Sequence, residues 1–164
     1  FYVISSNMSL ENLKPEILKI ISSQKSTQLK LQSICDTLHE IKNYDWVGFY
    51  FKNGSKNELK LGPFSGEATD HEIIPFGKGI CGQVAVSNEN FVIPDVSVQD
   101  NYIACNISVK SEIVIPIFLN NKNIGQIDID SDTINAFNAE DEKFLEFVCN
   151  EVSKLLAIST SQFV

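Results

Sequence analysis

The chain has 164 residues, a formal net charge of −8, 43% hydrophobic side chains and 21% charged side chains. A chain of this length buries roughly two thirds of the surface that its unfolded form exposes, so a single domain can fold without a metal or disulfides. The net acidity, with no cluster of Lys or Arg, argues against nucleic acid and anionic membranes as partners.

The cysteines are widely spaced and form no motif typical of a structural zinc site. They are Cys35, Cys81, Cys105 and Cys149. This spacing also differs from that of a secreted disulfide scaffold. Because no apolar run could span a membrane and no signal peptide is recognisable, we expect a cytoplasmic protein with reduced thiols. Residues 1–8 are interpreted as a leader or cloning-derived segment, and residues 9–164 as one domain.

The chain begins with the period of helices and then changes to that of strands. Apolar residues recur at helical spacing over residues 9–23 and 26–42, which predicts two helices. Residues 44–52 are rich in aromatic and branched side chains and predict a strand. Asn53-Gly54 is a turn signal, and residues 57–61 are typical of the returning strand.

The second half continues with strands and ends in a helix. We expect strands over 71–75, 91–93, 111–119 and 123–131, with a short helix over 80–87. Residues 95–108 are irregular, with one helical turn around Cys105. The last helix begins at Asn138, an N-cap residue followed by acidic residues that suit the positive end of the helix dipole.

Terminal helices with hairpin-linked strands between them predict an α+β fold. An antiparallel sheet would carry the terminal helices on one face. Residues 62–110 would cover the other face as a lid of loops and a short helix over a ligand pocket.

Three carboxylates are candidates for a binding site. Asp128 and Asp130 alternate with isoleucines, so a strand places both acids on one face, about 7 Å apart. Glu112 opens the partner strand. In one interpretation all three acids point to water. In the other they gather at a pocket, where they could hold an ammonium group or keep one acid protonated.

Two cysteines are candidates for a reactive thiol. Cys81 follows Gly77-Lys78-Gly79 at the start of a predicted helix, where the helix N-terminus and the lysine favour a thiolate. The alternative is a small buried side chain. Cys105 lies in the irregular segment, where a packing role is less natural. Cys35 and Cys149 border apolar helix stripes, so both are interpreted as structural.

Trp46, the single tryptophan, shares its strand with Tyr50. An aromatic strand of this kind belongs either to the core or to the wall of a small-molecule pocket, and the residues themselves leave both interpretations open.

Five ordered motifs run through the chain. They are YDWVGFY at 44–50 with LGPF at 61–64, IPFGKGICG at 74–82, IAC at 103–105, SEIV at 111–114 and IDIDS at 127–131. From about residue 26 to 156 the chain thereby resembles the free methionine-(R)-sulfoxide reductases. Members of that family are single GAF domains, often homodimers, that reduce free methionine sulfoxide. The resemblance implies no bound cofactor or metal, and thioredoxin or another thiol as the external reductant.

The resemblance also assigns roles by position. Cys105 matches the nucleophile that attacks the sulfoxide sulfur. Glu112, Asp128 and Asp130 match carboxylates that hold the substrate amine and hydrogen-bond the sulfoxide oxygen, and Trp46 matches a wall around the S-methyl group. The positions assigned to substrate binding are Trp46, Tyr50, Ala104, Glu112, Asp128 and Asp130.

The family chemistry needs a second thiol. A thiolate attacks the sulfur and the protonated oxygen leaves as water; water then attacks the cysteine sulfur, which releases methionine and leaves a sulfenic acid. A resolving thiol then closes a disulfide, which thioredoxin reopens. Members usually carry a further cysteine shortly before the position of Cys81, but residues 68–72 (ATDHE) contain none. Tyr102 and Asn106 also depart from the usual histidine and acid. Any intramolecular disulfide is therefore expected between Cys81 and Cys105.

Three functions stay open. The first is a reductase in which Cys81 or an external thiol resolves the intermediate. The second is a non-catalytic GAF sensor of methionine sulfoxide or a similar amino acid. The third is a cyclic-nucleotide-type GAF module, suggested by Asn121-Lys122 and the later Phe137 and Asp141-Glu142, although the net acidity argues against a phosphate ligand.

Overall fold

The computed structural model describes residues 9–100 and 108–161, and within them the central feature is a six-stranded sheet. The strand order is β3-β2-β1-β6-β5-β4, and each neighbouring pair is antiparallel. The strands are β1 Trp46–Lys52, β2 Glu58–Ser65, β3 Ile73–Pro75, β4 Phe91–Ile93, β5 Ser111–Leu119 and β6 Lys122–Ser131.

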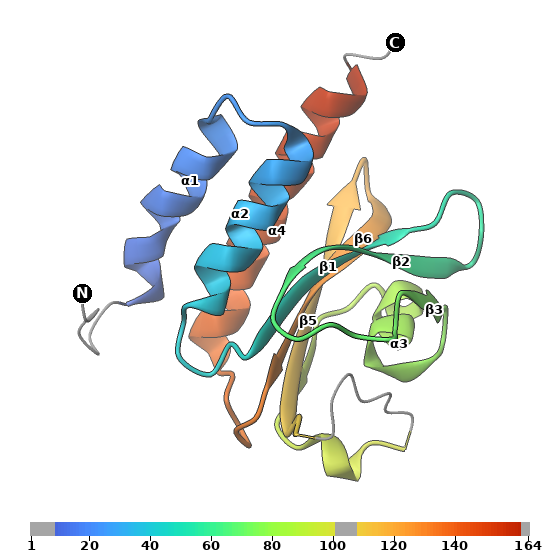
Figure 1. Ribbon diagram of the computed structural model, residues 1–164. Helices are drawn as coiled ribbons and strands as arrows, with labels where there is room; N and C mark the ends of the chain where they lie inside the picture. The colour runs from blue at the N-terminus through green and yellow to red at the C-terminus, as the bar shows by residue number, and fades with distance from the viewer. Residues whose placement is uncertain (1–8, 101–107, 162–164) are drawn as a thin grey trace.

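Helices from both ends of the chain cover one face of this sheet (Figure 1). They are α1 Lys14–Ser22, which follows the 3₁₀ turn η1 Leu10–Leu13, α2 Thr27–His39 and α4 Ala139–Ser161. The short helix α3 Gly79–Ser87 lies on the opposite side, and the 3₁₀ turn η2 is Val96–Val98. The α+β prediction and the position of the terminal helices are confirmed. No helix of the described ranges is long and apolar enough to cross a bilayer.

Local signals explain where the elements begin. The Ser26 hydroxyl accepts a hydrogen bond from the backbone N–H of Leu29 and caps α2. The Asn138 side chain accepts from the backbone N–H groups of Glu140 and Asp141 and caps α4, as predicted. Asn120 and Asn121 join β5 to β6 with φ values of 51° and 62°, which a two-residue hairpin of the primed type requires.

Two predicted boundaries differ from the observed ones. β2 continues to Ser65, beyond the predicted end at residue 61, because Phe64 and Ser65 pair with β1 across an irregularity in its register. Gly62 and Pro63 conceal this extension in the sequence. Helix α2 ends at His39, before the predicted end at residue 42, and the chain then turns through Asn43 with a φ of 72°.

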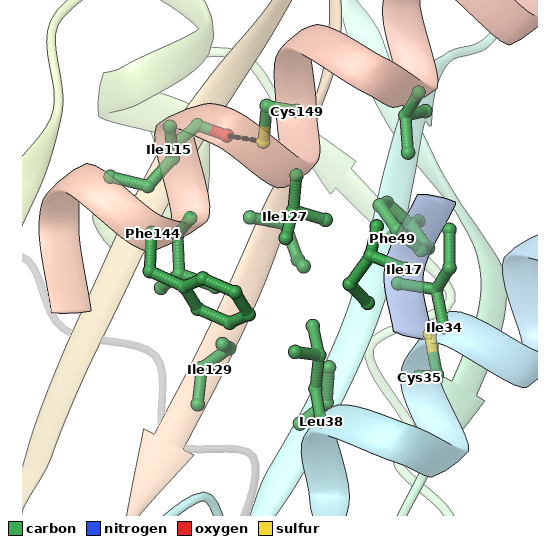
Figure 2. Packing of buried hydrophobic residues seen from close by; sticks show 14 of the residues in the cluster. Ile17, Ile34, Cys35, Leu38, Phe49, Ile115, Ile127, Ile129, Phe144 and Cys149 are labelled. Carbon is green, nitrogen blue, oxygen red and sulfur yellow. Dashed lines mark hydrogen bonds between the residues drawn. The ribbon is translucent and has the colours of Figure 1, made fainter. Parts of the chain in front are cut away.

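The main hydrophobic core lies between the sheet and the helices (Figure 2). Ile17 and Ile34 from the helices pack toward Phe49 and Ile127 of the two central strands. Each large apolar side chain buried in this way contributes about 1.5–3 kcal/mol. Alternate residues of the central strands, such as Phe49 and Ile127, thus face the helices, and the residues next to them in the strand face the other side of the sheet.

Cys35 and Cys149 belong to this core. The Cys35 thiol donates to the backbone oxygen of Pro63, at 3.4 Å. The Cys149 thiol donates to that of Ile115, at 3.7 Å (Figure 2). Both side chains are buried, so the predicted structural location of these two cysteines is confirmed.

Candidate functional site

The register of three adjacent strands brings the predicted carboxylates together. Asp130 of β6 pairs directly with Glu112 of β5 on one side and with Trp46 of β1 on the other. Asp128, two residues before Asp130, lies on the same face of β6 because strand side chains alternate. Directly opposed residues have Cβ atoms about 4.5–5.5 Å apart. The acids therefore form one group on the face turned away from α1, α2 and α4.

All three acids are buried. The exposed fractions are 4% for Glu112, 1% for Asp128 and 2% for Asp130. These values exclude the interpretation in which the carboxylates simply point to water. Burial of charge is unfavourable unless a partner compensates it, so this group is typical of a site that binds something.

Burial and mutual repulsion change the protonation of the group. Burial, followed by the charges of Asp128 and Asp130, raises the pKa of Glu112 well above its usual value of 4.5. Burial also raises the pKa of Asp128. A carboxyl group kept neutral in this way can donate a hydrogen bond, in line with the interpretation in which the acids gather at a pocket.

Cys81 lies beside the carboxylates, in the first turn of α3. Its Sγ is 3.9 Å from Oε1 of Glu112, and the side chain is 5% exposed. The Gln126 side chain donates through Nε2 to the Cys81 backbone oxygen at 3.1 Å, which fastens α3 to β6. Sulfur and carboxylate oxygens of Cys81, Glu112 and Asp128 all lie within 4.8 Å of one another, so these residues are also candidates for a metal site.

Two small cavities lie on this face. One, of about 10 Å³, is lined by Cys81, Glu112 and Asp128 together with His71, Ile74, Lys78, Gly79 and Ile80. The other, of about 40 Å³, is lined by Trp46 and Asp130 together with Asp45, Glu67, Ala68, Val109 and Asp132. One enclosed pocket stays a prediction, because residues 101–107, part of the segment expected to cover it, lie outside the described part of the chain. Asp130 pairs with the first residue of β1 and faces Trp46, whereas Asp128 lies one pleat further in, beside α3.

Trp46 forms an aromatic wall next to Asp130. Its ring stacks on Phe64, with centroids 5.7 Å apart and an interplanar angle of 18°, and its centroid is 6.3 Å from that of Tyr50. The indole N–H donates to the backbone oxygen of Glu67 at 3.0 Å. Tyr50 is fully buried and donates to the backbone oxygen of His71 at 2.9 Å. These two hydrogen bonds thus hold residues 67–71, the segment that borders both cavities.

Gly48 and Gln126 belong to the site but escaped the sequence analysis. A Cβ at Gly48 would lie 2.3 Å from Cη2 of Trp46, so only glycine lets the indole lie across β1. A glycine inside a strand, here between Trp46 and Tyr50 on the same face, is a sign of such a close approach. Gln126 is fully buried and precedes Asp128 by two positions, so the period of the strand could have assigned it to the same face.

Ala104 and Cys105 lie outside the described residues. The structure places neither the predicted nucleophile nor the predicted Cys81–Cys105 pair, and both stay predictions. Of the remaining predicted site residues, the sheet brings together Trp46, Tyr50, Glu112, Asp128 and Asp130, with Cys81 joining them from α3.

Comparisons with known proteins agree with this arrangement. Residues 27–156 match the family model described as the GAF domain. The chain is similar to GAF domain-containing protein A of Dictyostelium discoideum, with 36% identity over 93% of this chain and 92% of that protein. It is also similar to the free methionine-R-sulfoxide reductase of Escherichia coli, with 34% identity over 89% of this chain and 87% of that protein.

A solved structure extends the similarity to three dimensions. The free methionine-R-sulfoxide reductase of Neisseria meningitidis, solved in complex with its substrate, superimposes with a TM-score of 0.88. The two chains are 30% identical, and the match covers 93% of this chain and 91% of that one. The chain therefore belongs to the GAF domain family and, within it, to the family of the free methionine-(R)-sulfoxide reductases.

Proposed function

We propose that this protein reduces free methionine-(R)-sulfoxide to methionine. The observation that carries the proposal is the buried group of Glu112, Asp128 and Asp130 beside Trp46, in a chain with sulfoxide reductases among its relatives. A free amino acid offers the ammonium group that such carboxylates would neutralise.

The site contains complementary groups for each part of the substrate. The side chains of Asp128 and Asp130 would bind the ammonium group, whose positive charge would offset the burial that raises the pKa of Asp128. A protonated Glu112 would donate a hydrogen bond to the sulfoxide oxygen, which its raised pKa supports. The face of Trp46 would pack against the S-methyl group.

The redox step uses thiols of the chain. The Cys105 thiolate attacks the sulfoxide sulfur, and the oxygen passes with a proton to the cysteine sulfur, which leaves methionine and a sulfenic acid. A second thiol then attacks the sulfenic sulfur, releases water and forms a disulfide. Cys81 is the candidate for this second thiol because it borders the carboxylates. An external dithiol such as thioredoxin would reduce the disulfide.

A coupled assay tests this function. Reduced protein, thioredoxin, thioredoxin reductase and NADPH should oxidise NADPH when free methionine-(R)-sulfoxide is added. The (S) diastereomer should support no turnover, since it presents oxygen and methyl group in exchanged positions. Absence of turnover with both diastereomers, and with a small dithiol in place of thioredoxin, would contradict the proposal.

A second candidate is a non-catalytic sensor that binds the same ligand. Residues 68–72 carry no thiol where the family usually has one, and this observation favours a protein that binds without a complete redox cycle. Calorimetric titration with free methionine-(R)-sulfoxide separates the two. Binding without any methionine formed would identify a sensor.

A further inference from the structure

We infer that Cys81, Glu112 and Asp128 form a zinc-binding site, and that bound Zn²⁺ reversibly inhibits the reduction of methionine sulfoxide. The inhibition rests on the proposed function, whereas the metal site rests on the geometry of these three side chains alone. They come from α3, β5 and β6, so their separation in the sequence hides the site from an analysis of spacing.

The donor atoms already lie close to the required arrangement. The three ligand atoms are within 4.8 Å of one another, and Sγ of Cys81 is 3.9 Å from Oε1 of Glu112. Tetrahedral zinc holds sulfur at about 2.3 Å and carboxylate oxygen at about 2.1 Å, which places these two ligand atoms about 3.6 Å apart. For this pair a contraction of a few tenths of an ångström, within reach of side-chain rotation, suffices, and the pairs with Asp128 would close from at most 4.8 Å.

The Asp128 side chain independently indicates a missing ligand. It is 1% exposed, and in the described part of the structure its carboxyl oxygens face only Glu112 and Cys81, the other members of this cluster, with no further hydrogen-bond donor in range. The ion pairs found among the described residues include neither Asp128 nor Glu112. A buried carboxylate in this state is costly, and a bound cation would compensate it.

The size of the adjoining cavity fits an ion better than an amino acid. Cys81, Glu112 and Asp128 all line the cavity of about 10 Å³. A space of this size holds about one water-sized particle. In this conformation the site could therefore accept a metal ion without opening, whereas methionine sulfoxide requires more room.

The ligand types select zinc among the common divalent ions. A thiolate is a soft ligand that favours zinc, whereas Mg²⁺ and Ca²⁺ require a shell of six or more oxygens. Three protein ligands leave one tetrahedral position for water, as in zinc sites with an open position. The inference thus differs from the structural zinc site that the cysteine spacing argued against.

Inhibition follows from which groups the ion would hold. Zinc on Asp128 would neutralise a carboxylate that the substrate ammonium group needs. Zinc on Glu112 would occupy the carboxyl group that the sulfoxide oxygen needs, and zinc on Cys81 would block its sulfur as resolving group. All three effects disappear when a chelator removes the metal.

Metal binding is tested on the reduced full-length chain without substrate. Titration with Zn²⁺ by calorimetry should give a saturable site, and Co²⁺ should produce the absorption band of a cobalt–thiolate bond. Cys81→Ser and Asp128→Asn should each weaken Zn²⁺ binding at least about tenfold. Loss of a residue that only orients a metal ligand already lowers metal affinity by about that factor, and loss of the ligand itself should lower it at least as much. Two control variants should keep the wild-type affinity for Zn²⁺. They are Cys105→Ser and Cys149→Ser, which removes a buried thiol from the core between the sheet and the terminal helices.

Several outcomes would overturn the inference. These are a Co²⁺ spectrum without a thiolate band, unchanged Zn²⁺ affinity in folded Cys81→Ser, or loss of binding in Cys105→Ser alone. If Asp128→Asn does not fold, the wild-type Co²⁺ spectrum and Cys81→Ser still decide. Turnover that saturating Zn²⁺ does not lower would overturn the inhibition. Zinc binding in a protein that never forms methionine would overturn the proposed function and leave the metal site standing.

Discussion

At the scale of single residues, the buried carboxylates have the largest consequences. Glu112 and Asp128 both have raised pKa values, chiefly because burial removes them from water. In the folded protein they therefore retain protons over a pH range in which the unfolded chain has released them. Such groups make the stability of the fold depend on pH.

The first prediction concerns this pH dependence. A raised carboxyl pKa contributes fully to stability below the unfolded value of 4.5, and the contribution is lost as pH rises toward the folded pKa. Each proton released on unfolding changes the unfolding free energy by about 1.4 kcal/mol per pH unit in that range. Urea unfolding should therefore show Glu112→Gln gaining stability relative to wild type from pH 5 upward. The exposed Glu89→Gln is the control, and a pH-independent difference for Glu112→Gln would contradict the expectation.

The second prediction concerns ligand affinity. Replacing Asp130 by Asn should weaken binding of free methionine-(R)-sulfoxide by roughly 2–4 kcal/mol, as expected for loss of one partner in a buried charge contact. Calorimetric titration measures this change. Asp36→Asn, an exposed acid on α2, should bind like wild type. Equal affinities for Asp130→Asn and wild type would show that the amine is held elsewhere.

The third prediction concerns the thiols. Burial raises the pKa of Cys35 and of Cys149, which disfavours the reactive thiolate at both. Alkylation of the native protein at neutral pH should therefore label Cys105 first and Cys81 next. Mass spectrometry of the peptides gives the order, and Cys149 as the fastest thiol would refute the assignment.

At the scale of elements, β1 joins the core to the site. Val47 and Phe49 face the helices, while Trp46, Gly48 and Tyr50 face the carboxylates. The aromatic composition predicts a strand here, but it does not decide which residues face the core. Pairing with β6 decides this, since it sets Trp46 against Asp130.

The fourth prediction concerns the glycine in β1. A Cβ at position 48 would lie 2.3 Å from the Trp46 ring and 3.1 Å from Cβ of Phe64. Gly48→Ala should therefore displace the indole, lower the unfolding free energy by about 1–3 kcal/mol and weaken ligand binding. Adding Trp46→Phe removes the obstructing atoms, so the double variant should be more stable than the sum of the two single changes predicts. Strict additivity in urea unfolding would mean that the ring does not constrain position 48.

At the scale of the whole molecule, periodicity predicted the layers well. The terminal helices carry an apolar stripe at helical spacing, and the β5–β6 hairpin alternates apolar residues that face the helices with residues that face the site. The predicted end of β2 at residue 61 was wrong, because pairing with β1 overrides the local preference of Gly62 and Pro63 to end a strand.

The candidate site was predictable in part. Alternation placed Asp128 and Asp130 on one face, but whether that face meets water depends on α3 and on segments distant in the sequence. The proximity of Cys81 to Glu112 likewise arises only when α3 packs on the sheet. Non-local packing of this kind leaves no periodic signal in the sequence.

The most direct test is a single turnover without any external reductant. Reduced wild-type protein is mixed with excess free methionine-(R)-sulfoxide, and the methionine released is counted by mass spectrometry. We expect about one methionine per chain, since oxygen transfer to a cysteine needs no second protein. The (S) diastereomer and the Cys105→Ser variant should yield none. Bound sulfoxide with no methionine released, or equal release by Cys105→Ser, would contradict reduction by this chain through its predicted nucleophile.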